Sequence, residues 1–222
     1  MCRPYLIYYI LFVAATYCVK ITYLLSRLDR RMNFCKLGLA VIETEAQAVL
    51  ELTQRIDERF ETACELLLAC KGRVVVTGMG KSGHIAHKIA ATLSSTGTPA
   101  FFMHPGEASH GDMGMISKGD VVILLSNSGE TSELNDIIAY CKRFDICLIG
   151  WARKAGSTLI EASNIPFVLP GIPEANEINA PTTSTTMMLA LGDALAVALL
   201  ERIGFVAEDF KTLHPGGKLG AQ

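Results

Sequence analysis

The chain lacks an excess of charge of either sign. It carries 20 Lys and Arg residues against 22 Asp and Glu residues, which gives a formal net charge of −2 at pH 7. It also lacks a segment rich in Lys or Arg. Binding to nucleic acid draws much of its affinity from clustered positive charge, so we expect no nucleic-acid partner. An anionic ligand would have to be held by local geometry instead.

Cys-x-x-Cys pairs are also absent. Seven cysteines occur, at positions 2, 18, 35, 64, 70, 141 and 147, and several stand in apolar segments such as ACELLLAC and DICLIG. Such cysteines are typical of buried free thiols in a reducing compartment. The pattern therefore predicts a cytoplasmic protein.

Low-complexity tracts, long repeats and linker-like segments are missing as well. Half of the 222 residues are apolar and 19% are charged, which is the composition of a folded globular protein. A chain of this length builds one well-formed core, and two full domains would be crowded. We therefore divide it into an apolar N-terminal extension, residues 1–31, and one domain, residues 32–222.

The origin of the extension is open to three interpretations. Tyr5–Val19 is almost wholly apolar, Lys20 interrupts it, and a basic cluster follows at residues 27–31. A membrane-spanning helix needs about twenty apolar residues, so this run is marginal as an anchor. A signal sequence is disfavoured because no small-residue cleavage site follows. We favour the third interpretation, a start site set too early, since Met32 opens a segment typical of a soluble helical protein. We expect no membrane partner.

Hydrophobic periodicity divides the domain into two parts. From Leu39 to Cys70 apolar residues recur at three- and four-residue spacings, which predicts two helices with a break near Ile56–Phe60. After Gly72, short β-branched runs alternate with helical segments. The predicted strands are Val74–Thr77, Ala100–Met103, Val121–Leu125, Ile146–Gly150 and Pro166–Leu169, and the predicted helices are Ser82–Ser95, Ser132–Phe144, Thr158–Ala162 and Thr182–Ile203. This alternation predicts an α/β fold, a doubly wound, flavodoxin-like, five-stranded parallel sheet with N-terminal helices.

Two turns at the carboxyl ends of predicted strands carry ligand-binding features. In Arg73–Gly83 (RVVVTGMGKSG) the glycines match G-x-G-x-x-G, but no ribose-binding acid follows within Thr96–Met103. The spacing is not that of a P-loop either. The glycines could merely let strand and helix pack closely, but Lys81 and Ser82 favour a turn that binds a smaller phosphate ligand.

The second turn lies in Val121–Glu133 (VVILLSNSGETSE), where an apolar strand ends in serines before a helix begins near Thr131. Ser126, Ser128 and Thr131 supply hydroxyls beside the positive end of a helix dipole, which favours an anion, most often a phosphate. A helix cap, with Glu130 and Asn127 forming a capping box, is the plainer alternative. The hydroxyls exceed what a cap requires, so we predict a phosphate site.

Further candidates for proton transfer lie in loops and at a helix start. The segment His104–Asp112 brings together two histidines and two acids, which favours acid–base work or metal binding, although the spacing is not that of a zinc helix. Glu133 stands in the first turn of the helix after the serines, where a solvated acid is equally expected. Glu174 and Glu177 lie in a loop before the last helix. The tail, His214–Gly220, could reach the site of another subunit.

Taken together, VVVTGMGKSG, HPGEASHGDMG, LLSNSGETSE, APTTSTTMMLALGDALAVALL and EDFKTLHPGGKLG resemble the SIS (sugar isomerase) domain of the arabinose 5-phosphate isomerase family, from about Leu39 to Gly220. The resemblance implies interconversion of D-arabinose 5-phosphate and D-ribulose 5-phosphate through an enediol, which supplies octulosonic acid for lipopolysaccharide or capsule. It also implies a homotetramer, and chemistry that requires no cofactor.

The resemblance also assigns site residues. The implied catalytic residues are Lys81, Glu133, Glu174 and His214. The implied substrate-binding residues are Ser82, Gly97, Thr98, His104, His110, Ser126, Ser128 and Thr131. His104 is also the family's candidate contact for a zinc ion. The segment around Glu174 is one residue shorter than the family pattern, so Glu177 could take its role.

Two other functions remain as alternatives. One is isomerisation of a different phosphosugar, such as a hexose or heptose phosphate. The other is a non-catalytic phosphosugar sensor, which would not need Lys81, Glu133, His110 and His214 together. Many relatives continue into a pair of CBS domains after the motif HPGGKLG, whereas this sequence stops there. We therefore do not predict regulation through such a pair.

Overall fold

The computed structural model describes residues 33–213 of the chain. The expectations for residues 1–31, for His214 and for the rest of the tail lie outside the described residues. Residues 33–42, which include the first part of α2 (Phe34–Leu52), belong to a separate unit, and from Glu43 onward the chain forms a second unit around the sheet.

The second unit is built on a five-stranded parallel sheet in the order β2-β1-β3-β4-β5. The strands are β1 (Val74–Gly78), β2 (Ala100–Met103), β3 (Val121–Leu125), β4 (Cys147–Ala152) and β5 (Ile165–Val168). This order confirms the flavodoxin-like prediction. The winding direction reverses between β1 and β3, and ligands in such sheets bind beyond the carboxyl ends of the strands at that point.

The central strands β1 and β3 are buried along their whole length because both faces of the sheet are covered. In β1, Val74 and Val76 point into one hydrophobic core and Val75 points into the other. This explains why the strands read as continuous β-branched runs rather than as alternating patterns.

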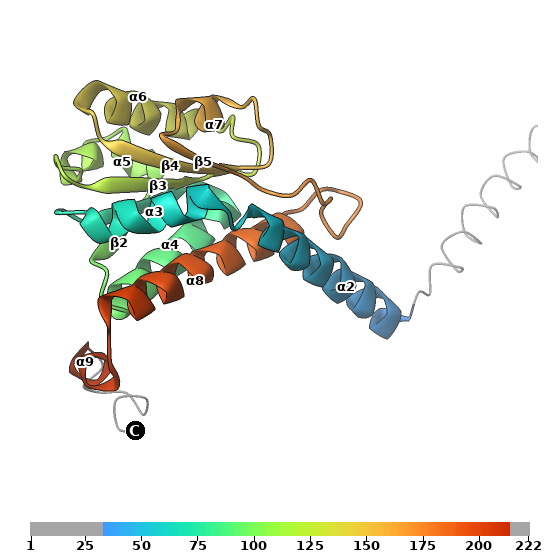
Figure 1. Cartoon of the computed structure of the whole chain (residues 1–222). Helices are drawn as coiled ribbons and strands as arrows, with labels where there is room; N and C mark the ends of the chain where they lie inside the picture. The colour runs from blue at the N-terminus through green and yellow to red at the C-terminus, as the bar shows by residue number, and fades with distance from the viewer. Residues whose placement is uncertain (1–32, 214–222) are drawn as a thin grey trace, which may run out of the picture. The chain divides into compact units, whose positions relative to one another are not determined.

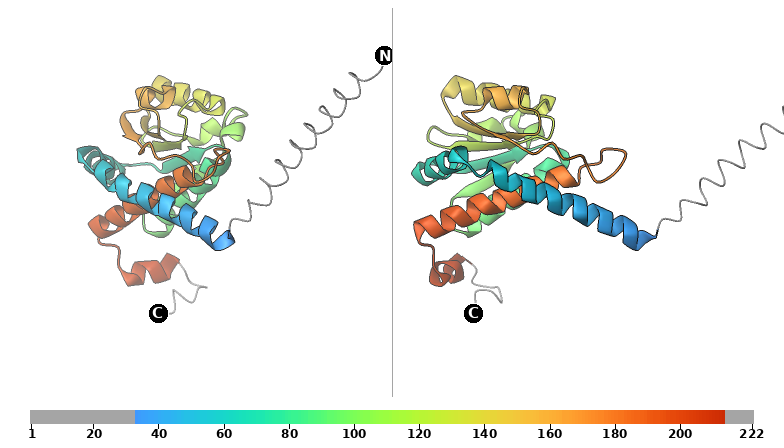
Figure 2. Two further views of the ribbon diagram at one scale, coloured as in Figure 1. Left: turned by 90° about the vertical axis from the view of Figure 1, so that its right-hand side faces the viewer. Right: turned by 45° about the vertical axis from the view of Figure 1, so that its right-hand side comes forward.

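Helices form a layer on each side of the sheet (Figure 1). The first core packs α3 (Glu58–Ala69), α4 (Gly80–Ser95) and α8 (Thr183–Ile203) on one face, together with Ala48 and Leu52 at the end of α2. The second core packs α6 (Asn135–Phe144) and α7 (Thr158–Ala162) on the other face. Figure 2 shows the same layers from two further directions.

α8 is the one helix in the described part of the chain that is long and apolar enough to cross a membrane. Its buried residues include Met187, Leu191 and Leu195, which belong to the first core. Half of the apolar stretch is buried, so packing against the sheet and the neighbouring helices accounts for that half of its apolar character.

The predicted elements agree with the structure except in the shortest segments. The break between the first helices, expected near Ile56–Phe60, begins slightly earlier, at a 3₁₀ turn, η1 (Thr53–Arg55). α3 begins after Asp57, whose carboxylate accepts a hydrogen bond from the Arg59 N–H at 3.0 Å. The sequence did not predict α5 (Pro105–Ala108), η2 (Asp112–Met115) or α9 (Ala207–Leu213). The first two are too short for a periodicity of 3.6 residues to show.

The cysteines in the described range are free thiols; Cys64 and Cys141 are buried as the sequence predicted, whereas Cys35 is exposed. Cys141 is 1% exposed, and burial raises its pKa to about 12. Burial likewise raises the pKa of Cys64 to about 11. Both thiols therefore stay protonated near neutral pH.

Candidate functional site

The two predicted ligand-binding turns lie side by side. β1 and β3 are neighbours in the sheet, and Gly78 at the end of β1 pairs in register with Leu125 at the end of β3. Both turns follow these strands directly, so they share the carboxyl edge of the sheet at the reversal point. The fold thus brings Lys81 and Ser82 to the same edge as the serine loop, which we define as residues 126–131.

Glycines in the first turn let the chain approach itself closely. A Cβ at Gly83 would lie 2.5 Å from the carbonyl oxygen of Gly78, and Gly80 has a φ of +58°. These two glycines therefore serve the turn and the packing of α4 on β1, as the plainer interpretation held. Lys81 follows Gly80 in the first turn of α4 and is exposed, so its amine is available at the edge of the sheet.

The serine loop gathers hydroxyl groups around one point. Ser126 Oγ lies 2.8 Å from Thr131 Oγ1 and 3.5 Å from Ser128 Oγ, and it accepts the N–H of Gly129 at 3.0 Å. Ser128 Oγ accepts the N–H of Glu130 at 3.1 Å. A 3₁₀ turn, η3 (Ser132–Leu134), follows and runs into α6. Clustered hydroxyls at the positive end of a helix are suited to hold a phosphate.

The capping-box interpretation of this loop is wrong. The Glu130 carboxylate accepts hydrogen bonds from Thr158, at 3.2 Å from the backbone N–H and at 2.7 Å from the hydroxyl. Lys154 lies 4.0 Å from the same carboxylate. Hydrogen bonds from Thr158 hold the pKa of Glu130 below its ordinary value. Glu130 therefore anchors the serine loop to α7 and does not pair with Asn127.

Glu174, rather than Glu177, faces the serine loop. Glu174 is 8% exposed, and its carboxylate accepts a hydrogen bond from the Asn127 side-chain amide at 3.3 Å. It also accepts the backbone N–H groups of Thr182 at 2.8 Å and Ser184 at 3.2 Å, at the start of α8. Glu177 is exposed. The shortened segment therefore still presents Glu174 to the edge of the sheet.

The charge of Glu174 is held by neutral donors. Burial alone would raise its pKa, but the hydrogen bonds from Ser184 and Thr182 outweigh burial, and the net pKa lies below its ordinary value. Glu174 is thus an ionised carboxylate beside the serine loop. In this structure it also caps the N-terminus of α8.

Glu133 follows the serine loop in the sequence, lies in η3, and is exposed. Its own backbone N–H and the Ser132 hydroxyl, 2.9 Å from Oε2, lower its pKa. It is therefore an ionised carboxylate just beyond the carboxyl end of β3. Lys81 stands just beyond the carboxyl end of the adjacent strand, β1, so the two opposite charges share this edge of the sheet.

The histidine loop is more structured than the sequence suggested. His104 caps α5, because its Nδ1 accepts the backbone N–H of Gly106 at 3.1 Å. Its ring meets the edge of Phe102, and Phe102 in turn stacks on His87. His110 is exposed after α5. Within residues 33–213 no three His, Cys, Asp or Glu side chains are grouped so that they could hold a metal ion. Nε2 is therefore the only nitrogen of His104 that is free to bind a metal, and among the described residues it belongs to no group of three such ligands.

Gly97 and Thr98 lie away from the other predicted substrate-binding residues. They precede β2, at the amino edge of the sheet, where Thr98 donates its backbone N–H to the Leu93 carbonyl at 2.9 Å. Gly97 has a φ of +92° and packs against Ile203 and Phe205. Within one chain the structure therefore does not bring these two residues to the serine loop.

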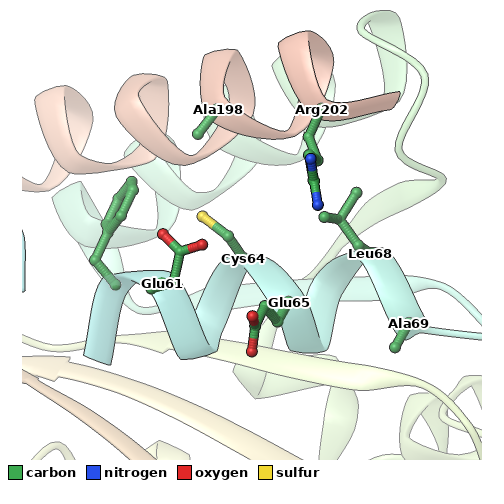
Figure 3. A pocket seen from close by; sticks show the side chains of 8 residues that line it. Glu61, Cys64, Glu65, Leu68, Ala69, Ala198 and Arg202 are labelled. Carbon is green, nitrogen blue, oxygen red and sulfur yellow. The ribbon is translucent and has the colours of Figure 1, made fainter. Parts of the chain in front are cut away.

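A separate hollow of about 560 Å³ lies between α3 and α8. Figure 3 shows Cys64 and Leu68 of α3 on one side and Ala198 and Arg202 of α8 on the other. Glu61 also lines it. The hollow lies between helices of one layer and does not include the serine loop, so it adds no group to the site described above.

The sequence did not identify how the supporting residues hold the site together. Asn127, Thr182 and Ser184 bond to Glu174, and Thr158 bonds to Glu130, across separations of 8 to 47 positions along the chain. Three of these supporting residues stand within motifs that the sequence singled out, but nothing in a motif indicated the partner of each. Their contacts become visible only once the strands and loops are brought together.

Comparison with known proteins gives consistent matches. The SIS domain family model matches residues 67–198. Arabinose 5-phosphate isomerase KdsD of Pseudomonas aeruginosa is 54% identical over 194 residues, covering 87% of this chain and 60% of that protein. KdsD of Escherichia coli K12 is 50% identical over 189 residues, covering 85% and 58%. The chain therefore spans about 60% of the length of the curated relatives it matches.

Two solved structures share the fold at substantial identity. The E. coli CFT073 protein c3406, solved in complex with arabinose 5-phosphate, has a TM-score of 0.80 and 41% identity, covering 84% of this chain and 100% of that chain. A Bacteroides fragilis protein described as a phosphosugar isomerase involved in capsule formation has a TM-score of 0.79 and 34% identity, covering 83% and 99%.

Proposed function

Because the chain belongs to the SIS domain family, we propose that it is an aldose–ketose isomerase that interconverts D-arabinose 5-phosphate and D-ribulose 5-phosphate. The observation that carries this proposal is the hydroxyl cluster of Ser126, Ser128 and Thr131 beside an ionised, buried Glu174. The named activity of the KdsD relatives and the ligand of c3406 support the choice of substrate.

The chemistry fits the residue types at this edge. Isomerisation moves a proton between adjacent carbons through a cis-enediol, so it needs a base at C2, a group that shuttles protons between O1 and O2, and a donor or cation near the oxygens. At this edge Glu133 and Glu174 are the candidates for base and shuttle, and Lys81 for polarising the oxygen. His214, which lies outside the described residues, is a further candidate for base or shuttle from the family resemblance. The serine loop would fix the phosphate, so that binding energy orients C1 and C2. We propose that this chemistry requires no cofactor.

The assembly and setting of the enzyme are part of the proposal. We place it in the cytoplasm, where it would feed octulosonic acid synthesis for lipopolysaccharide or capsule. We also propose the homotetramer that the family resemblance implies. Within one chain Gly97 and Thr98 lie at the amino edge of the sheet, so the substrate contacts implied for them would be made to another copy. His214 in the tail is proposed to act in the same way.

A coupled assay with pentose, hexose and heptose phosphates tests the activity. We expect turnover of arabinose 5-phosphate above the other sugars. Preferred turnover of a hexose or heptose phosphate would favour another SIS isomerase. Saturable binding without turnover of any sugar would favour a sensor. Expression from Met1 and from Met32, followed by membrane fractionation, tests whether residues 1–31 come from a start site set too early or form a membrane anchor.

Glu133→Gln and His214→Asn test the catalytic assignment. If these groups transfer protons, each variant should lose about 10²–10⁴-fold in kcat while KM changes little. Glu161→Gln, on the exposed face of α7, is the control and should retain wild-type kinetics. Unchanged turnover in both test variants would remove these residues from the mechanism.

A further inference from the structure

Asn127 lies between Ser126 and Ser128 in the serine loop, yet its side chain does not join the hydroxyl cluster. Its Nδ2 donates to Glu174 Oε1 at 3.3 Å, and its Oδ1 is buried without a hydrogen-bond partner among residues 33–213. An ionised carboxylate can only accept, so the amide must present nitrogen, not oxygen, to Glu174. The backbone carbonyl of Asn127 is held separately, by the N–H of Arg153 at 3.0 Å.

Asn127 is the only hydrogen-bonded link that the described residues provide between the Glu174 carboxylate and the serine loop. The other donors to this carboxylate, Thr182 and Ser184, belong to the start of α8. None of the ion pairs found in residues 33–213 involves Glu174. The Arg153 guanidinium also contacts the loop that carries Glu174, but it donates to the backbone carbonyl of Ile172 at 3.4 Å and not to the carboxylate. Glu174 Oε1 therefore depends on a neutral amide for its placement.

We propose that Asn127 is a positioning residue that fixes the Glu174 carboxylate beside the serine loop, so that the carboxylate and the phosphate-binding hydroxyls act on one substrate molecule. The part of this proposal that concerns the substrate rests on the proposed function. The physical basis is that Ser126, Asn127 and Ser128 are consecutive, with hydroxyls directed to one another and the amide directed to Glu174. Capture of the phosphate and placement of the carboxylate are thereby set by the same short segment.

The variants Asn127→Asp and Asn127→Ala test whether Asn127 acts by donating a hydrogen bond to Glu174 or only by filling space beside it. Asp has nearly the shape of Asn but replaces the donor to Glu174 with a second carboxylate oxygen, whereas Ala removes the group. Loss of a donor to the charged form raises the pKa of a carboxyl, and a neighbouring like charge raises it further. Both variants keep the backbone bond to Arg153, and thermal unfolding checks that they fold.

The first measurement is the titration of Glu174 by ¹³C carboxyl NMR, assigned with Glu174→Gln. The pKa of Glu174 should rise in Asn127→Ala and rise more in Asn127→Asp. Asn164→Asp is the matched control, because it adds the same charge before β5, at the opposite edge of the sheet, and keeps the Oδ1 acceptor for Leu148 N–H. An unchanged Glu174 titration in both Asn127 variants would overturn the proposal, whatever the enzyme's activity.

The second measurement is steady-state kinetics on arabinose 5-phosphate. Both Asn127 variants should lose at least about tenfold in kcat with less than about threefold change in KM, and the acidic limb of the kcat profile should move to higher pH. Asn164→Asp should match the wild type. Wild-type kinetics in Asn127→Asp would show that only the shape of the side chain matters and would overturn the proposal. A wild-type protein without turnover, but with the Glu174 shift present, would contradict the proposed function and leave the Asn127–Glu174 link supported.

Discussion

At the scale of single residues, Gly129 shows how tightly the serine loop is built. Its φ is +70°, and a Cβ there would overlap the side chain of Ser157. Ser157 is fully buried at the start of α7. The loop therefore needs glycine both for its backbone conformation and for its contact with α7.

Gly129→Ala should destabilise the fold by at least about 2 kcal/mol, because backbone strain and overpacking add. It should also weaken phosphosugar binding, since the hydroxyls are carried by the same loop. Gly171→Ala is the matched control, because a Cβ there meets nothing within 4 Å. Urea unfolding and calorimetric binding measure the two effects, and equal stability of the two variants would contradict this account.

Cys141 gives a second prediction at this scale. Burial raises its pKa to about 12 from 9.0, which lowers the thiolate fraction at neutral pH on the order of a thousandfold. In folded protein, iodoacetamide should label the exposed Cys35 rapidly and Cys141 only after unfolding. Peptide mapping by mass spectrometry distinguishes the two sites, and equal rates in the native state would show that Cys141 is accessible.

At the scale of elements, α8 depends on a cap supplied from the loop before it. The Glu174 carboxylate accepts N–H groups at its start, and the pKa of Glu174 lies below its ordinary value of 4.5. A carboxyl with a lowered pKa in the folded state stabilises the fold above its unfolded pKa. That contribution should be full above pH 4.5 and should disappear as the pH falls through the folded pKa.

Glu174→Gln should therefore lower the free energy of unfolding by about 1–3 kcal/mol at neutral pH, and the difference from wild type should shrink below the ordinary pKa. Glu177→Gln, an exposed residue of the same loop, should have little effect. Chemical denaturation across this pH range is the measurement. A difference that stays constant with pH would show that the charge of Glu174 does not cap α8.

Helices and strands could be predicted where burial leaves a regular pattern of apolar residues in the sequence. They could not be predicted where the element is too short to show such a pattern. β3 was predicted with its observed bounds because both faces are buried and every residue is apolar. α5 has only four residues, so no periodicity marks it. The bond from Asn127 to Glu174 spans 47 positions and depends on how β3 and the α8 loop meet, which no local pattern encodes. The position of Gly97 at the amino edge of the sheet, by contrast, could be predicted from the sequence, because Gly97 directly precedes the predicted strand Ala100–Met103.

At the scale of the whole molecule, the sheet explains why residues from distant segments serve one function. The reversal between β1 and β3 places Lys81, the serine loop and Glu133 at one edge, and the loop before α8 adds Glu174. Other predicted residues, such as Gly97, lie at the opposite edge. Within one chain, therefore, the described residues of the site come from the carboxyl edge alone, and the implied role of Gly97 depends on the proposed homotetramer.

A crystal structure of the protein with arabinose 5-phosphate tests this arrangement most directly. The account predicts the phosphate within hydrogen-bond distance of Ser126, Ser128 and Thr131, with C1 and C2 of the sugar directed toward Glu174 or Glu133. A phosphate bound elsewhere, with the serine loop unoccupied, would contradict it.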